Sequence, residues 1–538
     1  MIEYGKKGIK KLVFISCALV LPLVVFLWEK TENSEFLGLR EITMEEKGRM
    51  TKERRKAKDD LLGSLYFNQE EIVKGNGDIY YLPLSMEEKW ERGKITGKKE
   101  ENIICIIKEG ERKKKQEYQS GKEVRKLFVY NEDSYQEVTL CMTALPVLSI
   151  EFMECPREVF LEEEEIYSKL YFYAPKKELE KRVQAVHSYS ILHKRGDSSK
   201  EFEKCGLKLK LIDKKGKKKN ENLLGLRKDD DWVLIPMYAE ESKLRDKFAI
   251  DLWREIADGE RQDNRGTRME YVELILNGVY YGLYGLAVPI DKKQLGLVEH
   301  GEESDLLFCI DTTAGVDFAG LERAGESVQA GNITVKFPKS MNQEKWNTIR
   351  DFFQLVYFQE DRIFAEEIEN WVEMDNMADF YLFLNVIYGK DNTLKNMYYC
   401  MRLQEDGTYR VSLIPWDMDL SFGTLYDGEN QNGLFWKYDT GKNLEEEECA
   451  CYLTKRIREL NIGKFEAILK KRYGELRQYI LKEEKLFGQI ESLSEQIICS
   501  GAFYRDLEAW RGGGHSTDYS MMKEAIRRRL IYLSDLEG

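Results

Sequence analysis

Histidine is scarce in this chain of 538 residues. The four that occur, His187, His193, His300 and His515, are dispersed along it. A histidine-rich metal site and a Ser-His-Asp triad are therefore not expected. The ten cysteines form no Cys-x-x-Cys pair, which argues against a zinc ribbon and against a dense disulfide framework. Any chemistry is expected to depend on carboxylates and lysines.

Proline and excess positive charge are also lacking. Only nine prolines occur and hydrophobic residues make up 42% of the chain, so we expect a folded rather than a disordered protein. The net charge of −13 argues against a general nucleic-acid binder. Basic clusters at 111–116 and 214–219 are interpreted as solvated loop tips. We therefore expect no nucleic-acid partner.

The N-terminus carries the clearest local signal. Residues 1–11 contain four lysines, and residues 12–28 (LVFISCALVLPLVVFLW) carry no charge. That length suits a span of a thin bilayer or the apolar part of a signal peptide. No small-x-small cleavage site follows, which favours an uncleaved anchor over a removed signal. The lysines predict a single-pass cell-membrane protein with most of the chain extracytoplasmic, or a secreted protein if the signal is cleaved.

Composition divides the chain into five consecutive regions. Residues 1–30 hold the signal-anchor, and residues 31–60 form a charged juxtamembrane stalk. Residues 61–142 have short apolar runs broken by charge, typical of a small β-rich region, and carry no functional signal. Residues 143–295 are predicted to be mostly sheet with one helix, and residues 296–538 mainly helical. The predicted class is α+β.

Three segments have strong local patterns. Residues 242–257 place apolar side chains at nearly helical spacing, which predicts an amphipathic helix. Asn277-Gly278 between alternating apolar runs predicts a β-hairpin over 269–287. Residues 376–389 are apolar around most of a helical circumference, which predicts a buried helix.

A polar constellation follows that buried helix. Asp391 comes directly after it, and Asn396 comes five positions later. Residues 396–402 and 409–416 are predicted to be two strands joined by a turn, and Asp417 and Asp419 follow the second strand. Pairing of the strands would bring Asn396 and Asp417 together at the open end of the hairpin.

Phosphoryl transfer needs such a set of groups. One carboxylate orients or deprotonates the attacking hydroxyl, while an amide and a carboxylate hold Mg²⁺ against the phosphates. Protein kinases use Asp-x4-Asn, a hairpin and then a metal-binding Asp near Phe-Gly. Here Gly389-Lys390 stand where kinases have His-Arg, and no Gly-x-Gly-x-x-Gly occurs. Asp and Asn are also common loop residues, and Asp417 would serve equally as a helix or turn cap.

Five blocks in fixed order give a more specific resemblance. They read RGDSSK…LKLKL, DDDWVLIPMYAEESKLRDKFAIDLWREI, VELILNGVYYGLYGL, GKDNTLKNMYY and IPWDMDLSFG. Together with the closing segments LRQYIL, AWRGG and AIRRRLIYL, they resemble the spore coat protein H (CotH) kinase-like family from about residue 143 to the end. Residues 1–140 lie outside the resemblance.

The resemblance implies an atypical protein-kinase-like fold with two lobes, a β-rich N-lobe (143–295) and a helical C-lobe (296–538). It also implies an enzyme that binds ATP with Mg²⁺ or Mn²⁺ and phosphorylates serine hydroxyls of a surface or coat protein. By motif match, Asp391 would be the catalytic base. Asn396, Asp417 and Asp419 would be metal ligands, with no distinction between the two aspartates.

The RGDSSK segment resembles the phosphate-binding Arg-Gly-Asn-Ser-Ser loop of the family. Arg195 and Ser198 would offer a guanidinium and a hydroxyl to the phosphates of ATP. Asp197 replaces the Asn of the family, and a carboxylate beside a triphosphate is unfavourable unless a cation offsets it. An alternative is that Arg195 only pairs with Asp197 across a turn.

Lys208 and Lys210, on one face of the next predicted strand, are candidates for a phosphate-pairing lysine. Arg245 or Glu255 in the following helix would order that lysine. One of the two lysines is expected to be an ordinary solvent-facing residue. The acidic run at 229–231 is interpreted as a cap beside a buried Trp232 rather than as a metal site.

Three functions remain open on the sequence. The favoured one is a membrane-anchored protein serine kinase. The second is a catalytically inactive surface or coat interaction protein on the same fold. The third is a carbohydrate-binding module that uses exposed Tyr and Trp, although the aromatic residues of 271–286 are better explained as hairpin packing.

Overall fold

The computed structural model describes residues 37–83, 93–108, 124–153, 165–175, 183–196, 198–260, 263–300, 303–426, 436–439 and 441–537. The predicted anchor at 12–28 lies outside these ranges. No helix within them is long and apolar enough to cross a membrane. The chain is a mixed α+β protein, with a β-rich N-terminal half and a helical C-terminal part, as the composition predicts.

The chain forms two compact units, one of residues 1–147 and 172–185 and the other of residues 148–171 and 186–538. Within the described part of the first unit, seven strands form one sheet in the order β1-β8-β9-β10-β6-β5, with β2 paired to β10. Three further strands form a small sheet in the order β4-β3-β7. The elements of this unit are β1 (Arg40–Ile42), α2 (Met44–Glu53), β2 (Arg55–Lys56), β3 (Leu65–Phe67), β4 (Glu70–Glu71), β5 (Val73–Lys74), β6 (Ile79–Leu82), β7 (Ile95–Gly97), β8 (Ile103–Ile107), β9 (Val124–Tyr130) and β10 (Ser134–Met142).

Local sequence accounts for the main features of this unit. Thr43 and Glu46 form a reciprocal capping box at the start of α2, which satisfies backbone N–H groups that the first helical turn leaves unpaired. Phe128 on β9 belongs to a buried cluster with Ile42 and Cys105, so one face of the sheet is apolar.

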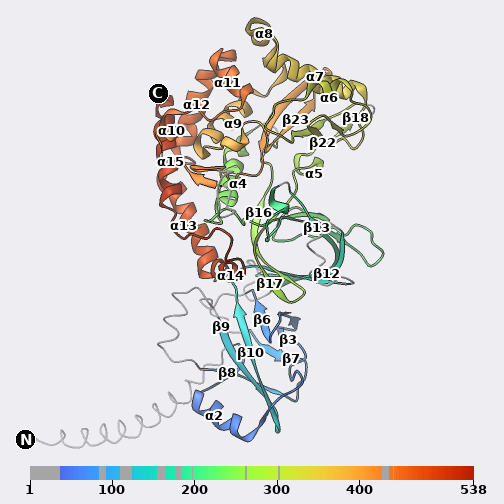
Figure 1. Cartoon of the computed structure of the whole chain (residues 1–538), viewed down its shortest axis with the longest axis vertical. Helices are drawn as coiled ribbons and strands as arrows, with labels where there is room; N and C mark the ends of the chain where they lie inside the picture. Colours follow the sequence, from blue (N-terminus) through green and yellow to red (C-terminus); the bar gives the residue numbers. More distant parts are fainter. Residues whose placement is uncertain are drawn as a thin grey trace, which may run out of the picture. The chain divides into compact units, whose positions relative to one another are not determined.

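Most residues of a closed barrel belong to the second unit (Figure 1). Seven strands of the described chain follow one another around it in the order β11-β12-β13-β14-β15-β17-β16. The predicted hairpin is confirmed: Leu276 pairs with Val279, and Asn277 and Gly278 both have positive φ, as a tight primed turn requires. The barrel strands are β11 (Val147–Phe152), β12 (Ile166–Pro175), β13 (Val183–Lys194), β14 (Leu207–Ile212), β15 (Asp231–Ile235), β16 (Met269–Leu276) and β17 (Val279–Ala287).

Two helices link the barrel to the helical part. The predicted amphipathic helix is α4 (Arg245–Ile256). The predicted buried helix is α9 (Met374–Ile387), in which every residue from Asn376 to Ile387 is buried. Trp253 of α4 packs against Phe380 and Phe383 of α9, with ring centroids 5.9 and 5.2 Å apart. This aromatic contact fixes the C-terminal part of α4 against the middle of α9.

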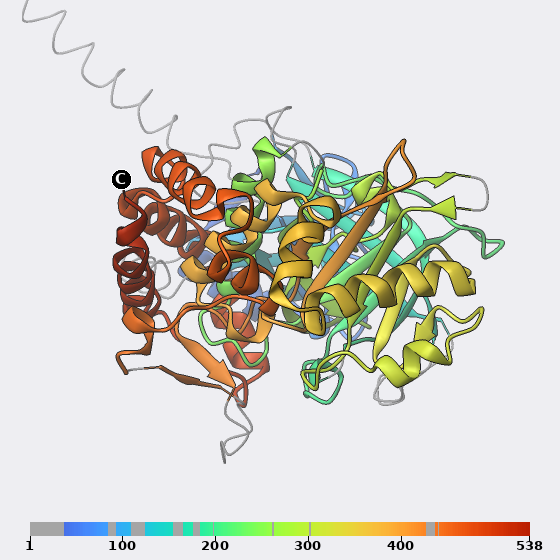
Figure 2. The same cartoon turned by 90° about the horizontal axis from the view of Figure 1, so that it is seen from above.

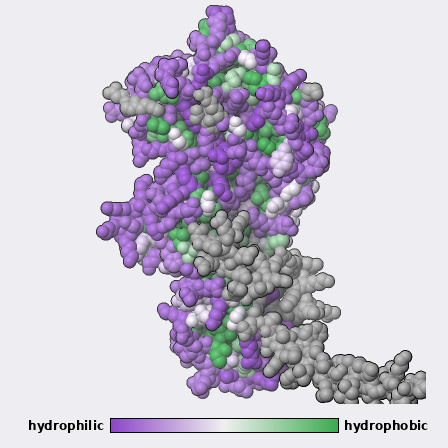
Figure 3. Space-filling model, turned by 180° about the vertical axis from the view of Figure 1, so that it is seen from behind, coloured by the Kyte–Doolittle hydropathy of each residue, from purple (hydrophilic) through white to green (hydrophobic). Residues whose placement is uncertain are grey.

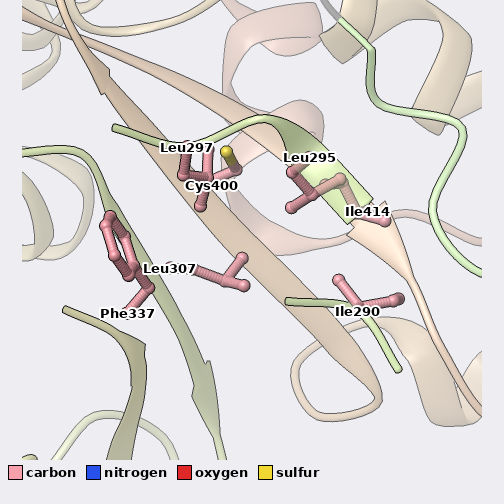
Figure 4. Close-up of a cluster of buried hydrophobic side chains, with 7 residues drawn as sticks. All are labelled: Ile290, Leu295, Leu297, Leu307, Phe337, Cys400 and Ile414. Carbon is pink, nitrogen blue, oxygen red and sulfur yellow. The ribbon is translucent and has the colours of Figure 1, made fainter. Parts of the chain in front are cut away.

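A second sheet of the described residues has the order β21-β22-β20-β23-β24. Figure 4 shows the apolar cluster on it, in which Leu307, Phe337, Cys400 and Ile414 meet Ile290. Its strands are β20 (Leu306–Ile310), β21 (Gln329–Ala330), β22 (Ile333–Phe337), β23 (Met397–Leu403) and β24 (Tyr409–Pro415).

The second unit also contains the remaining described helices. Helix α7 (Gln343–Tyr357) lies across it (Figure 2), where Phe353 packs against Phe308 and Tyr399. The other helices are α5 (Lys292–Leu295), α6 (Phe318–Glu322), α8 (Asp361–Trp371), α10 (Asn443–Glu446), α11 (Tyr452–Glu459), α12 (Phe465–Gln478), α13 (Glu483–Cys499), α14 (Ala502–Ala509) and α15 (Ser520–Tyr532).

Short elements complete the second unit. They are β18 (Glu299–His300), β19 (Glu303–Ser304), β25 (Thr424–Tyr426) and β26 (Trp436–Tyr438), with 3-10 turns η2 (Ser198–Lys200), η3 (Ala257–Gly259), η4 (Lys390–Asn392), η5 (Ile462–Lys464) and η6 (Leu533–Leu536). The described surface in Figure 3 is mostly hydrophilic, with small separate apolar patches.

Candidate functional site

The hairpin β23–β24 brings the predicted constellation together. Its pairing runs to Met397 opposite Pro415, and one step further the backbone N–H of Trp416 donates to the Asn396 carbonyl at 2.9 Å. Asn396 and Asp417 therefore lie side by side at the open end. The predicted proximity of these two residues is confirmed.

The backbone at this open end is left-handed. Asn396 has φ 57° and Asp417 has φ 59°, a conformation that Asn and Asp tolerate better than most side chains. Asp391 lies in η4, immediately after Tyr388 and Gly389 end α9. The buried helix, the turn and the hairpin together set where each polar side chain points.

A fully buried amide, that of Asn392, connects these segments. Its Nδ2 lies 2.9 Å from the Asn396 carbonyl, 2.8 Å from the Trp416 carbonyl and 3.3 Å from the Asp417 carbonyl. It therefore holds both left-handed residues against the turn that carries Asp391. Nothing in the sequence distinguishes Asn392 from an ordinary loop residue, and sequence reasoning missed it.

Asp391 is held by two donors on the same oxygen. Asn396 Nδ2 donates to its Oδ2 at 2.7 Å, and Lys395 Nζ lies 3.1 Å from that oxygen. These two contacts fix the orientation of the carboxylate. An oriented carboxylate is what a general base requires.

These residues line a cavity of about 770 Å³ within the described part of the second unit. Among the predicted site residues, the structure brings Arg195, Asp391, Asn396, Asp417 and Asp419 to its wall. Asp197 and the side chain of Ser198 lie outside the described residues. The neighbouring Gly196 and Ser199 do line the cavity.

Lys208 and Lys210 are not brought to this wall. On β14 they alternate with the buried Leu207 and Leu209, so both project from the other face of the strand. Lys208 Nζ lies 2.6 Å from Asp231 Oδ1, and Lys210 Nζ pairs with Glu165 at 3.6 Å. The lysines that line the cavity include Lys336 and Lys395.

The two residues predicted to order that lysine have other partners. Arg245 is buried, forms an ion pair with Glu240, and donates to the Ser421 carbonyl and the Tyr438 hydroxyl at 3.2 and 3.1 Å. Glu255 pairs with Lys485 of α13. Arg245 thus stabilises the loop that follows Asp419.

A third aspartate, which is buried, stands beside the two that sequence identified. Asp246, in the first turn of α4, accepts a hydrogen bond from the Met418 backbone N–H at 2.9 Å. Burial, and then the Asp419 and Asp417 carboxylates, raise the pKa of Asp246 well above its usual value. Burial, and then Asp417 and Asp391, raise the pKa of Asp419 in the same way. Carboxylates this close together favour a bound cation.

The donor set fits a nucleotide-bound divalent cation. No group of three or more His, Cys, Asp or Glu side chains within the described ranges is arranged to hold a metal by itself. Mg²⁺ in phosphoryl-transfer enzymes needs only one or two carboxylates, since phosphate oxygens and water complete its octahedron. Asn396, Asp417 and Asp419 supply such a partial set.

Aromatic and apolar side chains form the rest of the wall. Phe202 and Tyr238 lie with ring centroids 5.3 Å apart, and the Arg195 guanidinium lies 5.5 Å from the Trp416 ring. All four residues line the cavity. The cavity therefore combines flat apolar surface with cations and carboxylates, as a site for a planar base joined to phosphates does.

Comparison with known families agrees with this geometry. A family model described as CotH kinase protein matches residues 192–533, more than half of the chain. No curated protein matches the sequence. The matched range contains every residue that lines the cavity.

Proposed function

Because the chain belongs to the CotH kinase family, we propose that it is a metal-dependent protein serine kinase acting on a surface or coat protein. Membership in this family implies an atypical protein kinase that uses ATP. The serine acceptor, the Mg²⁺ or Mn²⁺ requirement and the identity of the site residues belong to the proposal. The supporting observation is that Asp391, Asn396, Asp417 and Asp419 line one cavity.

The proposed fold has two kinase-like lobes. The barrel and α4 correspond to the N-lobe over 143–295, and the second sheet with its helices corresponds to the C-lobe over 296–538. Residues from both line the cavity, Arg195 and Tyr238 from the first and Asp391 and Asp417 from the second. This distribution suits a nucleotide bound between lobes.

In the proposed mechanism Asp391 accepts the proton of the serine hydroxyl as its oxygen attacks the γ-phosphorus. Asn396 keeps the carboxylate oriented by donating to it. Asn396, Asp417 and Asp419 would hold the metal, which neutralises the charge that develops on the phosphates. Asp246 supports the Asp417–Asp419 loop through the Met418 N–H.

The Arg195 loop is proposed to bind the phosphates. Arg195 lies over the ring of Trp416, which precedes Asp417 in the sequence. Gly196 has a positive φ of 102° and would offer its backbone N–H. Such a turn favours anions, and Ser198 would add a hydroxyl. For Lys208 or Lys210 to reach a phosphate, its ion pair with Asp231 or Glu165 would have to break.

The proposed location is the cell membrane, with residues 12–28 as a single-pass anchor and the catalytic unit extracytoplasmic. A cleaved signal would instead give a secreted enzyme. Fusion of a reporter to the C-terminus, followed by protease treatment of intact cells, tests the orientation. A reporter protected from protease would contradict it.

Calorimetry of ATP binding tests the proposed function. The full chain is titrated with ATP in the presence of Mg²⁺, Mn²⁺ or a chelator, beside Asp417→Ala and Asp419→Ala. Metal-dependent binding by the wild type and its loss in at least one variant is expected, and the more affected variant identifies the main metal ligand. Asp406→Ala is the matched control, because Asp406 is exposed at the opposite end of the same hairpin.

Transfer of labelled phosphate from ATP to a serine-containing protein completes the test. The Asp391→Asn variant should bind ATP and transfer no phosphate. Absence of ATP binding under any metal would sink the kinase proposal. It would favour the inactive interaction protein on the same fold.

A further inference from the structure

Two lysines flank Asp391, and the structure gives them different surroundings. Lys395 lines the cavity and its Nζ lies 3.1 Å from Asp391 Oδ2. Lys390 forms an ion pair with Glu447 and lies over the Tyr388 ring at 5.1 Å. Lys390 is absent from the cavity wall. One lysine faces the reacting groups and the other supports the surrounding fold.

The carboxylates on the cavity wall make a cation near Asp391 favourable when a triphosphate binds. Among the described residues, seven carboxylates and four cations line the wall: Glu240, Glu241, Asp246, Asp311, Asp391, Asp417 and Asp419 against Arg195, Arg245, Lys336 and Lys395. A triphosphate entering beside them meets strong repulsion unless cations intervene. Metal at Asn396 and Asp417 would offset part of it. The oxygens of the transferred group that face Asp391 need a further donor.

Reaction geometry places the γ-phosphate oxygens within reach of Lys395. The acceptor hydroxyl must lie within hydrogen-bond distance of Asp391, and its oxygen must approach the γ-phosphorus to about 3–3.5 Å. The γ-phosphate oxygens therefore come close to the carboxylate that Lys395 already contacts. The lysine side chain is partly exposed, at 34%.

From these positions we propose that Lys395 is a catalytic residue that binds the transferred phosphoryl group. The proposal rests on the kinase function above. Without nucleotide, Lys395 pairs with Asp391. With ATP bound, its ammonium donates to a γ-phosphate oxygen, which frees Asp391 to accept the proton of the acceptor hydroxyl.

The step is balanced without a further reactant. The bond between the acceptor oxygen and phosphorus forms, and the bond between phosphorus and the β,γ-bridging oxygen breaks. ADP leaves with that electron pair, and the acceptor proton goes to Asp391. Lys395 remains protonated throughout and contributes only charge and hydrogen bonds.

Affinity for two nucleotides distinguishes this role from a structural one. The full chain, Lys395→Met and Lys395→Arg are titrated, with Mg²⁺, with ADP and with the ATP analogue that has an imido group between the β and γ phosphates. Lys395→Met should weaken binding of the analogue about tenfold and leave ADP affinity within about twofold. Lys395→Arg keeps the charge and should recover most of the loss.

Turnover supplies the second measurement. Lys395→Met should reduce kcat for transfer to a protein serine roughly 100-fold, the usual result of removing one donor to the transition state. Lys390→Met is the matched control and should change neither analogue affinity nor kcat by more than about twofold. Thermal unfolding of each variant checks that the fold is retained.

The outcomes separate this inference from the proposed function. If the wild type binds the analogue and transfers phosphate, but Lys395→Met weakens ADP and the analogue equally or neither of them, Lys395 does not bind the γ-phosphate and the kinase proposal stands. If the wild type binds neither nucleotide, the kinase proposal fails and this inference fails with it.

Discussion

Two groups of carboxylates in the second unit have opposite surroundings. Asp506 on α14 accepts from Lys204 Nζ at 2.7 Å, from the Leu283 N–H at 2.8 Å and from His515 Nε2 at 2.9 Å. Burial raises the pKa of Asp506, but Lys204, His515 and Lys243 together lower it by more, so that it falls below its usual value. The Asp506 carboxylate thus has cations and hydrogen-bond donors as its partners, and we call this cluster complete.

The cluster at the cavity consists of Asp246, Asp417 and Asp419. Its neighbouring charges are largely other carboxylates, and we call it incomplete. Asp246 is buried and Asp419 half-buried beside other carboxylates, and their pKa values are raised. Partial desolvation also raises the pKa of Asp417, although Arg195 and Lys395 lower it in part. The difference separates a buried charge that stabilises the fold from crowded carboxylates that cost stability and favour a cation brought by a ligand.

The largest expected effect comes from breaking the complete cluster. Asp506→Ala leaves Lys204 and Lys243 buried without their carboxylate, so we expect a loss of about 3–5 kcal/mol in the free energy of unfolding. Chemical denaturation at pH 7 measures it. Asp535→Ala, at an exposed position, is the control and should stay within about 0.5 kcal/mol. Equal small losses in both variants would contradict the comparison.

Glu260 extends the comparison to a carboxylate whose nearest partners are amides rather than a cation. Asn376 Nδ2 lies 3.0 Å from its Oε1, and Asn264 Nδ2 is 2.5 Å from its Oε2. Burial raises the pKa of Glu260 to about 7. The folded state therefore keeps a proton that the unfolded chain releases near pH 4.5, so this stabilisation is present at low pH and is lost as pH rises to about 7.

Denaturation as a function of pH measures that contribution. We expect Glu260 to account for a decline on the order of 3 kcal/mol between pH 4.5 and 7. Glu260→Gln should remove most of the decline in the free energy of unfolding that Glu260 causes over this pH range. An unchanged pH profile in the variant would show that Glu260 is ionised in the fold.

Filling the incomplete cluster should raise stability. ATP with Mg²⁺ at about 100 times its Kd is expected to stabilise the wild type by about 2.7 kcal/mol. Thermal unfolding with and without ligand measures this. Asp417→Ala should lose most of the gain. The same gain with ATP and a chelator would show that the carboxylates do not act through a metal.

The smallest expected effect comes from neutralising one member of the incomplete cluster. Asp419→Asn removes a half-buried charge that its neighbours repel, so the metal-free protein should become more stable by about 1 kcal/mol at pH 7. Nucleotide affinity with Mg²⁺ should fall in the same variant. Asp406→Asn, on the exposed turn, should change neither quantity. A marked loss of stability in Asp419→Asn would contradict the assignment of an incomplete cluster.

Local patterns in the sequence were sufficient for single elements of the scaffold, but not for the closed barrel or the five-stranded sheet. Asn277-Gly278 predicted its hairpin because few residue pairs adopt two successive positive φ angles. The apolar circumference of 376–389 predicted a buried helix because no polar face remained for water. The second hairpin placed Asn396 beside Asp417 because register follows from a short turn.

The rest of the site depends on contacts that local patterns do not encode. Asp246 and Met418 are 172 residues apart in the sequence, so the third aspartate emerges only when α4 packs beside the hairpin. Strand alternation predicted that Lys208 and Lys210 share a face, but it does not say which face meets the cavity. Asn392 acts through backbone carbonyls, which leave no residue pattern.

The hairpin that carries Asn396 and Asp417 has a second end. Its turn at Gln404–Thr408 is closed by the Thr408 carbonyl, which accepts from the Gln404 N–H at 2.8 Å, and residues 405–408 are exposed. Since the Asn392 amide fixes the working end independently, the exposed turn is free to vary in length and sequence. The turn is therefore suited to insertion of a fluorescent or affinity label that reports on the protein without contacting the candidate site.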